Sequence, residues 1–191
     1  MTHSTFSHLL RCGQLHPACH RKSGSPCLRV QRRVLKLNEC LLPSQIALDN
    51  RIQEFEKRNT LVLGVSIDSQ FTHNAWRNTA VVNGGIGPVR YPLIADVNHS
   101  ICQTYGVEHP SAHVALRGAF IIDKQGVVRS QIVNDLPLGR NVDELLRLID
   151  ALEFHEKHGE VCPAGWTKGK TGIEPTTEGI AKYLATEAQQ L

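Results

Sequence analysis

Acidic residues are missing from the start of this 191-residue chain, since no aspartate or glutamate occurs before Glu39. Seven lysines and arginines occupy the same segment and exceed the formal net charge of +3, so the remainder of the chain is slightly acidic. The basic character therefore belongs to this segment alone. The rest of the chain gives no reason to expect a nucleic-acid partner.

Long apolar runs are also absent. The chain has no run of the roughly 18 apolar residues that a membrane-spanning helix needs, so no membrane partner is expected. Near the start the longest apolar run is Leu9-Leu10, which is too short for the core of a secretory signal. A hydrophobic content of 41% and a charged content of 20% are typical of a soluble protein with one core.

Cysteines are scarce in most of the chain and crowded at its beginning. After the first forty residues only Cys102 and Cys162 remain. A secreted disulfide scaffold would be shorter and would spread its cysteines through the fold. We therefore expect a reducing, cytoplasmic environment. The four early cysteines are Cys12, Cys19, Cys27 and Cys40.

From about residue 43 the sequence alternates between helical and strand patterns. The run at 61–67 is almost continuously apolar, which is typical of a buried parallel strand. The turn-forming residues 123–126 separate two apolar runs and predict a β-hairpin. Asn141 opens the last long helix, with Glu144 as its capping-box partner. The other predictions are helices at 44–58, 71–79 (capped by Ser69), 98–105 and 179–189, and a strand at 92–96.

This order of elements is the second half of an α/β, thioredoxin-like sandwich. Residues 1–42 show no alternating apolar run, so we predict a basic, disordered leader there and N-terminal strands that are missing or replaced. Residues 43–158 then form the core and residues 159–191 a C-terminal tail. The strand at 61–67 would have an unpaired edge, and we expect a marginal or aggregation-prone fold.

Several motifs occur along the chain in a specific order. The most informative is Gly159-Glu160-Val161-Cys162-Pro163-Ala164-Gly165-Trp166. The others lie at 46–51, 64–69, 73–76, 84–88, 115–118 and 134–140. Over about three quarters of its length, the chain resembles the typical two-cysteine peroxiredoxins, also called the alkyl hydroperoxide reductase C or thiol-specific antioxidant family.

The resemblance implies a thiol peroxidase with a thioredoxin-like (peroxiredoxin) fold and no cofactor or metal. A peroxidatic thiolate would reduce hydrogen peroxide or an alkyl hydroperoxide and become a sulfenic acid. A resolving thiol of a neighbouring subunit would form a disulfide with it, which thioredoxin or a related disulfide reductase would open. The assembly that the resemblance implies is a homodimer or a decameric ring of such dimers.

Three of these motifs supply candidate site residues by this resemblance. Arg117 matches the arginine that faces the thiolate, where a fixed, permanently charged fork can also donate to a peroxide oxygen. Arg140 matches a second arginine of the same site, although it could equally be a charge at a helix start. Cys162 matches the resolving cysteine, with a buried structural thiol as the alternative.

The peroxidatic motif Thr-x-x-Cys-Pro is absent. The helix that follows it in the family is recognisable from Pro43, so the thiol is expected at about Leu41 or Leu42. Cys40 is the only nearby sulfur, and it lacks the neighbouring threonine and prolines. Two functions therefore remain open. The first is a peroxide reductase with Cys40 as a substitute nucleophile, and the second is an inactive, oligomerising or chaperone-like remnant.

Three origins for residues 1–42 also remain open. A gene-level lesion or an unusual start could have replaced the first third of the family sequence. An organelle transit peptide would fit the basic composition, but it would precede the missing strands and could not replace them. A metal site built from Cys12, His16, Cys19 and His20 matches no established ligand spacing.

Overall fold

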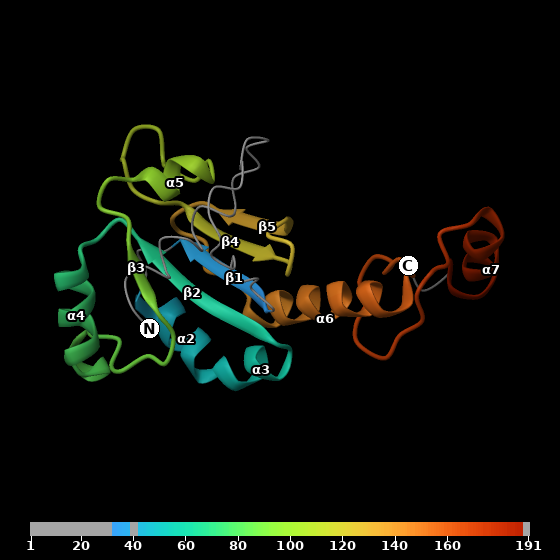
Figure 1. Ribbon diagram of the computed structural model, residues 1–191, viewed down its shortest axis with the longest axis horizontal. Helices are drawn as coiled ribbons and strands as arrows, with labels where there is room; N and C mark the ends of the chain where they lie inside the picture. The colour runs from blue at the N-terminus through green and yellow to red at the C-terminus, as the bar shows by residue number, and fades with distance from the viewer. Residues whose placement is uncertain (1–31, 39–41, 189–191) are drawn as a thin grey trace, which may run out of the picture. The chain divides into compact units, whose positions relative to one another are not determined.

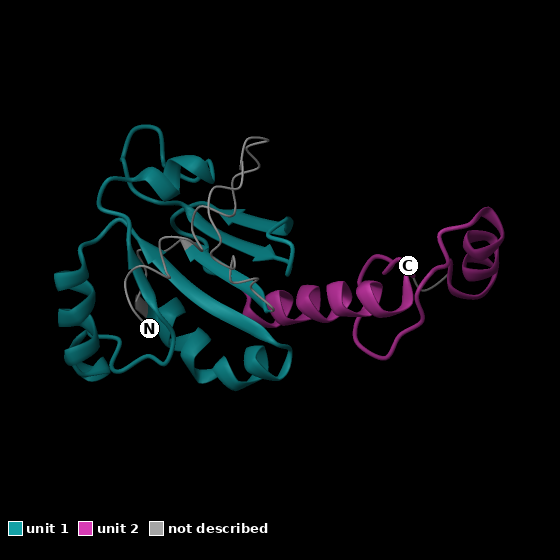
Figure 2. Cartoon of the chain, in the orientation of Figure 1, with its two compact units in different colours: residues 1–140 teal, residues 141–191 magenta. Residues whose placement is uncertain are grey.

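The computed structural model describes residues 32–38 and 42–188 and divides the chain into two units, residues 1–140 and 141–191 (Figure 2). Cys40 and the possible Cys12–His20 metal site lie outside the described residues. The first unit contains β1 (Arg33–Asn38), α2 (Leu42–Asn50), α3 (Ile52–Lys57), β2 (Thr60–Ser66), α4 (Gln70–Asn78), the short 3-10 helix η1 (Val81–Asn83), β3 (Leu93–Ala95), α5 (Ser100–Thr104), β4 (Arg117–Ile122) and β5 (Val128–Asn134). The second contains α6 (Val142–His158) and α7 (Thr177–Glu187).

A five-stranded mixed sheet forms the centre of the first unit, with strand order β3-β2-β1-β4-β5 (Figure 1). β1 runs parallel to β2 and antiparallel to β4. Helices α2 and α3 run alongside β1 and β2, and α5 contributes Cys102 to a buried cluster with Val107 and Phe120. The expected α/β class is confirmed.

The expectation that no strand precedes residue 43 is wrong for residues 33–38. They form β1, the central strand of the sheet, which pairs with β2 from Arg33 opposite Thr60 to Asn38 opposite Val65. The predicted unpaired edge of β2 is therefore wrong as well, because β2 pairs with β1 on one side and β3 on the other. The edges belong to β3 and β5.

A buried lysine explains why the β1 pattern is hard to recognise. Lys36 interrupts the apolar residues of the strand and is only 2% exposed. Its ammonium lies 3.6 Å from the centre of the Tyr105 ring, a cation–π contact that partly replaces the lost water. Leu35 and Leu37, whose side chains point to the other face, are fully buried.

Most of the remaining elements follow the sequence prediction. β2 coincides with the apolar run, and Ser69 caps α4 by accepting a hydrogen bond from the Thr72 amide. The β4–β5 hairpin turns at Asp123, whose carboxylate accepts from two backbone amides of the turn and from Arg129. The helix predicted at 44–58 is two helices, α2 and α3, separated at Arg51.

The second unit starts with the long helix α6. Asn141 caps it, accepting hydrogen bonds from the amides of Asp143 and Glu144. The predicted capping box is only half formed, because the Glu144 carboxylate bonds Arg147. The helix ends at Gly159, whose φ of 72° is the left-handed conformation that glycine adopts without strain. No helix in the described part of the chain could cross a membrane.

Candidate active site

Arg117, one of the residues that the sequence singled out, lies at the end of the sheet where its parallel strands finish, which we call the carboxyl edge. Parallel strands β1 and β2 end at this edge, and α2 begins nearby in the chain at Leu42. Arg117 opens β4, two residues before Ala119, the antiparallel partner of Leu37. The register therefore places Arg117 at the same edge as the end of β1.

Arg117 is a buried guanidinium with one nitrogen unused. Its side chain donates from Nε and Nη2 to the Leu136 carbonyl oxygen at 3.1 and 2.9 Å. Nη1 is buried and has no hydrogen-bond partner among the residues that the structure describes. A buried donor without a partner costs free energy and therefore indicates a missing group. The residue is only 7% exposed, so Arg117 is not a solvated surface charge.

Arg140 is the last residue of the segment 134–140. The Leu136 carbonyl group of this segment accepts the hydrogen bonds of Arg117. Asn134, which pairs with Arg117 in the hairpin, donates from Nδ2 to the Gly139 carbonyl oxygen at 2.9 Å. Arg140 is half-buried, and its Nε lies in a buried position. Arg117 thus holds the turn that carries Arg140.

A polar group at the end of β2 was not predicted as part of the site. The Ser66 hydroxyl and His73 Nε2 form a buried hydrogen bond of 2.6 Å, and burial lowers the pKa of His73. Two residues after Ser66, the Asp68 oxygen Oδ2 is buried without a hydrogen-bond partner. Ser66, Asp68 and His73 belong to the motifs at 64–69 and 73–76. The closeness of these two motifs in the sequence was the signal that could have predicted this polar group.

Thiols in the described residues are limited to Cys102 and Cys162. Cys102 lies in the buried cluster under α5 as a small apolar side chain, and burial raises the pKa of its thiol to about 11. Cys162 belongs to the second unit, where its Sγ donates to the Ala151 carbonyl oxygen at 3.6 Å. This part of the predicted C-terminal tail is packed, since Trp166, four residues later, is only 1% exposed.

This arrangement favours chemistry in which negative charge develops beside Arg117. The free Nη1 can donate to an anionic sulfur or to a peroxide oxygen, and its charge is permanent. Within the described ranges no group of histidine, cysteine and carboxylate side chains could hold a metal ion.

Comparison with protein families identifies two matching segments. Residues 44–131 match the AhpC/TSA family, and residues 151–186 match the C-terminal domain of 1-Cys peroxiredoxin. The first match begins directly after Pro43, so it includes neither β1 nor Cys40.

Individual relatives agree with this assignment. Alkyl hydroperoxide reductase C of Buchnera aphidicola (subsp. Acyrthosiphon pisum) is 50% identical over 144 residues, covering 75% of this chain and 73% of the relative. Its counterpart in Helicobacter pylori strain 26695 is 52% identical over 146 residues, covering 76% and 73%. Peroxiredoxin-4 of Rattus norvegicus is 53% identical over 139 residues, covering 73% and 51%.

Solved structures give the same result for the fold. The reduced 2-Cys peroxiredoxin of Plasmodium vivax superposes with a TM-score of 0.79 at 42% identity, covering 82% of this chain and 84% of that one. Sequence identity of this extent, together with the shared fold and the buried Arg117, shows that the chain belongs to the AhpC/TSA family of peroxiredoxins.

Proposed function

We propose that this chain is a thiol-dependent peroxide reductase in which Cys40 supplies the attacking sulfur beside Arg117. The observation that carries the proposal is the buried Arg117 Nη1, which has no hydrogen-bond partner within residues 32–38 and 42–188 and lies at the edge where β1 ends. A thiolate or a peroxide oxygen is the kind of acceptor that this donor lacks. Arg140, on the turn held by Arg117, is the second proposed donor.

The proposed reaction consumes one peroxide for each pair of thiols. The Cys40 thiolate attacks the terminal oxygen of the peroxide, the one that carries the hydrogen, and the O–O bond breaks. Sulfur becomes a sulfenic acid, and an alkoxide or hydroxide leaves and takes up a proton. The Cys162 thiolate of a neighbouring subunit then attacks this sulfur, which forms a disulfide and releases water after protonation.

A dithiol reductant of the thioredoxin type is the proposed partner that returns both cysteines to thiols. Hydrogen peroxide and alkyl hydroperoxides are the proposed substrates, and a reducing cytoplasm is the proposed compartment. A homodimer, or a ring of dimers, would bring Cys162 of one chain to Cys40 of another.

Peroxide consumption separates the roles of the two cysteines. Cys40→Ser should abolish turnover with either dithiothreitol or thioredoxin as reductant. Cys162→Ser should keep turnover with dithiothreitol, because a small dithiol can condense with the sulfenic acid directly, and should lose it with thioredoxin. Arg117→Met should lower kcat/KM by about 100-fold, the usual effect of removing a preorganised donor to a developing anion.

Lys124→Met is the matched control, since Lys124 is an exposed cation in the hairpin turn. It should leave all rates unchanged. Equal peroxide consumption by the parent protein and Cys40→Ser would rule out Cys40 as the nucleophile.

The second candidate function is an inactive, oligomerising remnant. It is favoured by the position of α2, whose first residue is Leu42 and not a cysteine. A rate at the background level in the unmodified protein, with preserved assembly, would support this candidate over the first.

A further inference from the structure

The loop that carries Cys162 is folded against the C-terminal half of α6. We call residues 159–173 the clasp. Its two ends meet where Val161 and Ile173 exchange backbone hydrogen bonds of 2.8 Å. A Cβ atom on Gly172 would collide with Glu160 and Phe154, so the chain passes very close to the helix.

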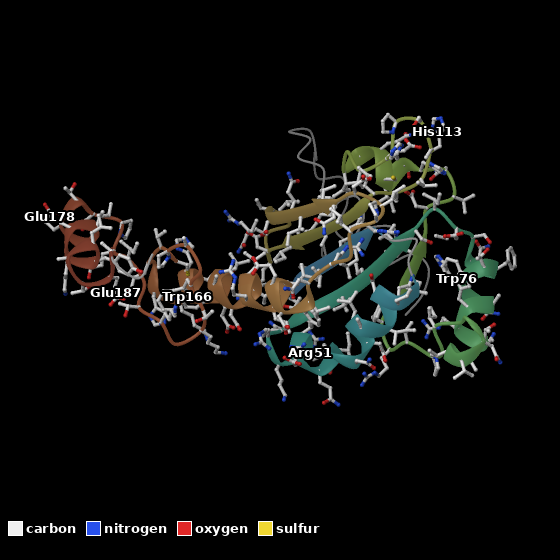
Figure 3. The ribbon with its side chains drawn as sticks, turned by 180° about the vertical axis from the view of Figure 1, so that it is seen from behind. Arg51, Trp76, His113, Trp166, Glu178 and Glu187 are labelled. Atoms are coloured by element: carbon white, nitrogen blue, oxygen red, sulfur yellow. The ribbon has the colours of Figure 1, made fainter. Side chains whose placement is uncertain are left out.

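Trp166 anchors the middle of the clasp (Figure 3). Its ring lies 4.9 Å from that of Phe154 on α6, and its Nε1 donates to the Lys170 carbonyl oxygen at 2.9 Å. The indole is almost completely buried and its polar atom is satisfied, which is the arrangement that makes tryptophan an effective packing anchor. The clasp is therefore an ordered element of the second unit.

Two bonds attach the Cys162–Trp166 part of the clasp to one face of α6. The Cys162 sulfur donates to the Ala151 carbonyl oxygen, and Arg147 Nη1 donates to the Trp166 carbonyl oxygen at 2.9 Å. Arg147 and Ala151 are four residues apart on a helix, so they lie one above the other on the same face. The Cys162 thiol and the Trp166 carbonyl group are thus held at adjacent turns of α6.

The Arg147 side chain is itself fixed in place. Its Nε and Nη2 donate to both Glu144 carboxylate oxygens at 2.6 and 2.7 Å, a bidentate pair. This pairing lowers the pKa of Glu144, so the carboxylate stays ionised at neutral pH. All three nitrogens of the Arg147 guanidinium therefore donate hydrogen bonds, and only Nη1 donates to the clasp.

We propose that Arg147, oriented by Glu144, is the positioning residue of the Cys162 thiol: it latches the clasp to α6 and keeps a positive charge beside the sulfur. The inference deepens the proposed role of Cys162 as the resolving thiol. To attack a sulfenic acid on another subunit, the sulfur must leave the Ala151 carbonyl, and the bond from Arg147 to Trp166 opposes that release.

Charge and burial act on the thiol in opposite directions. Burial raises the pKa of Cys162, the positive charge of Arg147 lowers it, and the Glu160 carboxylate in the clasp raises it. Among the described residues, Arg147 is thus the cation that influences this thiol. Loss of the guanidinium should change both the exposure of the sulfur and its ionisation.

Alkylation of the full, reduced chain by iodoacetamide between pH 6 and pH 10 tests the proposal, with the rate at Cys162 read from its own peptide by mass spectrometry. Arg147→Met and Arg147→Lys should both raise the limiting rate at high pH by roughly tenfold or more, because each loses the fork that holds the clasp. The midpoint of the pH profile should be higher in the Met variant than in the Lys variant, since only lysine keeps the charge.

Lys157→Met is the matched control. It removes a cation from the same helix that pairs with Glu153 through a 2.8 Å contact, and it should leave the Cys162 profile unchanged. Limiting rates within twofold of the parent protein in both Arg147 variants would overturn the proposal, as would equal midpoints. Cys102 is an internal reporter: an equal acceleration there would mean general loosening and would also overturn it. Because no peroxide is used, these outcomes do not depend on peroxidase activity.

Discussion

At the scale of single residues, the buried Lys36 amine is costly to the folded state of the first unit. Burial lowers its pKa to about 7, against an ordinary value of 10.5, and in the described part of the chain its ammonium has no hydrogen-bond partner. The unfolded chain therefore binds more protons than the folded chain between about pH 7 and pH 10.5. The contribution of Lys36 to the free energy of unfolding therefore rises with pH across that window and is lowest below pH 7.

Lys36→Met should accordingly stabilise the protein by roughly 3 kcal/mol at pH 7, since methionine has a similar shape and no charge to desolvate. The advantage over the parent protein should shrink by about 2 kcal/mol between pH 7 and pH 9. Urea unfolding of both proteins across this range measures the difference. Burial also raises the pKa of Cys102, which opposes the trend above pH 9, so the comparison should stop there. A constant difference at every pH would show that the pKa of Lys36 is the same in the folded and unfolded chain, as for a solvated amine.

At the scale of elements, the sequence predicted those segments whose pattern agrees with their surroundings. The strand at 61–67 and the hairpin at 123–126 were predictable because apolar runs and turn residues carry the whole signal. β1 was not, because Lys36 breaks its pattern and only pairing with β2 and β4 makes the segment a strand. The split between α2 and α3 at Arg51 depends on local backbone geometry that helical periodicity does not encode.

The N-terminus of α6 offers a prediction at the same scale. The Asn141 side chain satisfies two amides that have no partner within the helix. Asn141→Ala should destabilise the protein by about 1 kcal/mol, whereas Asn141→Asp keeps the acceptor and should cost almost nothing. Denaturant unfolding of the two variants measures the difference. Equal stabilities would show that the cap contributes little to the folded state.

At the scale of the whole molecule, the candidate site was only partly predictable. Motif order led to Arg117, Arg140 and Cys162, but it did not reveal that Arg117 has an unused nitrogen or that Arg147 holds the clasp. Both features depend on carbonyl groups, those of Leu136 and Trp166, that lie 19 residues away from the arginine in the chain. Contacts to backbone oxygens leave no residue-type signal, so only a structure can show them.

The association of copies of this chain can also be tested at this scale. Phe71 on α4 is 77% exposed and Val82 on η1 is 91% exposed. Exposed apolar side chains of this size are typical of contact surfaces, and each fully buried one would contribute about 2 kcal/mol. If copies of the chain associate through this segment, Phe71→Asp combined with Val82→Asp should reduce a larger ring to dimers, because an interface cannot bury unpaired carboxylates. Light scattering of the purified protein measures the mass.

Val97→Asp, at an exposed apolar position outside this segment, is the control and should leave the mass unchanged. A ring that survives the double change would show that α4 and η1 do not form the contact.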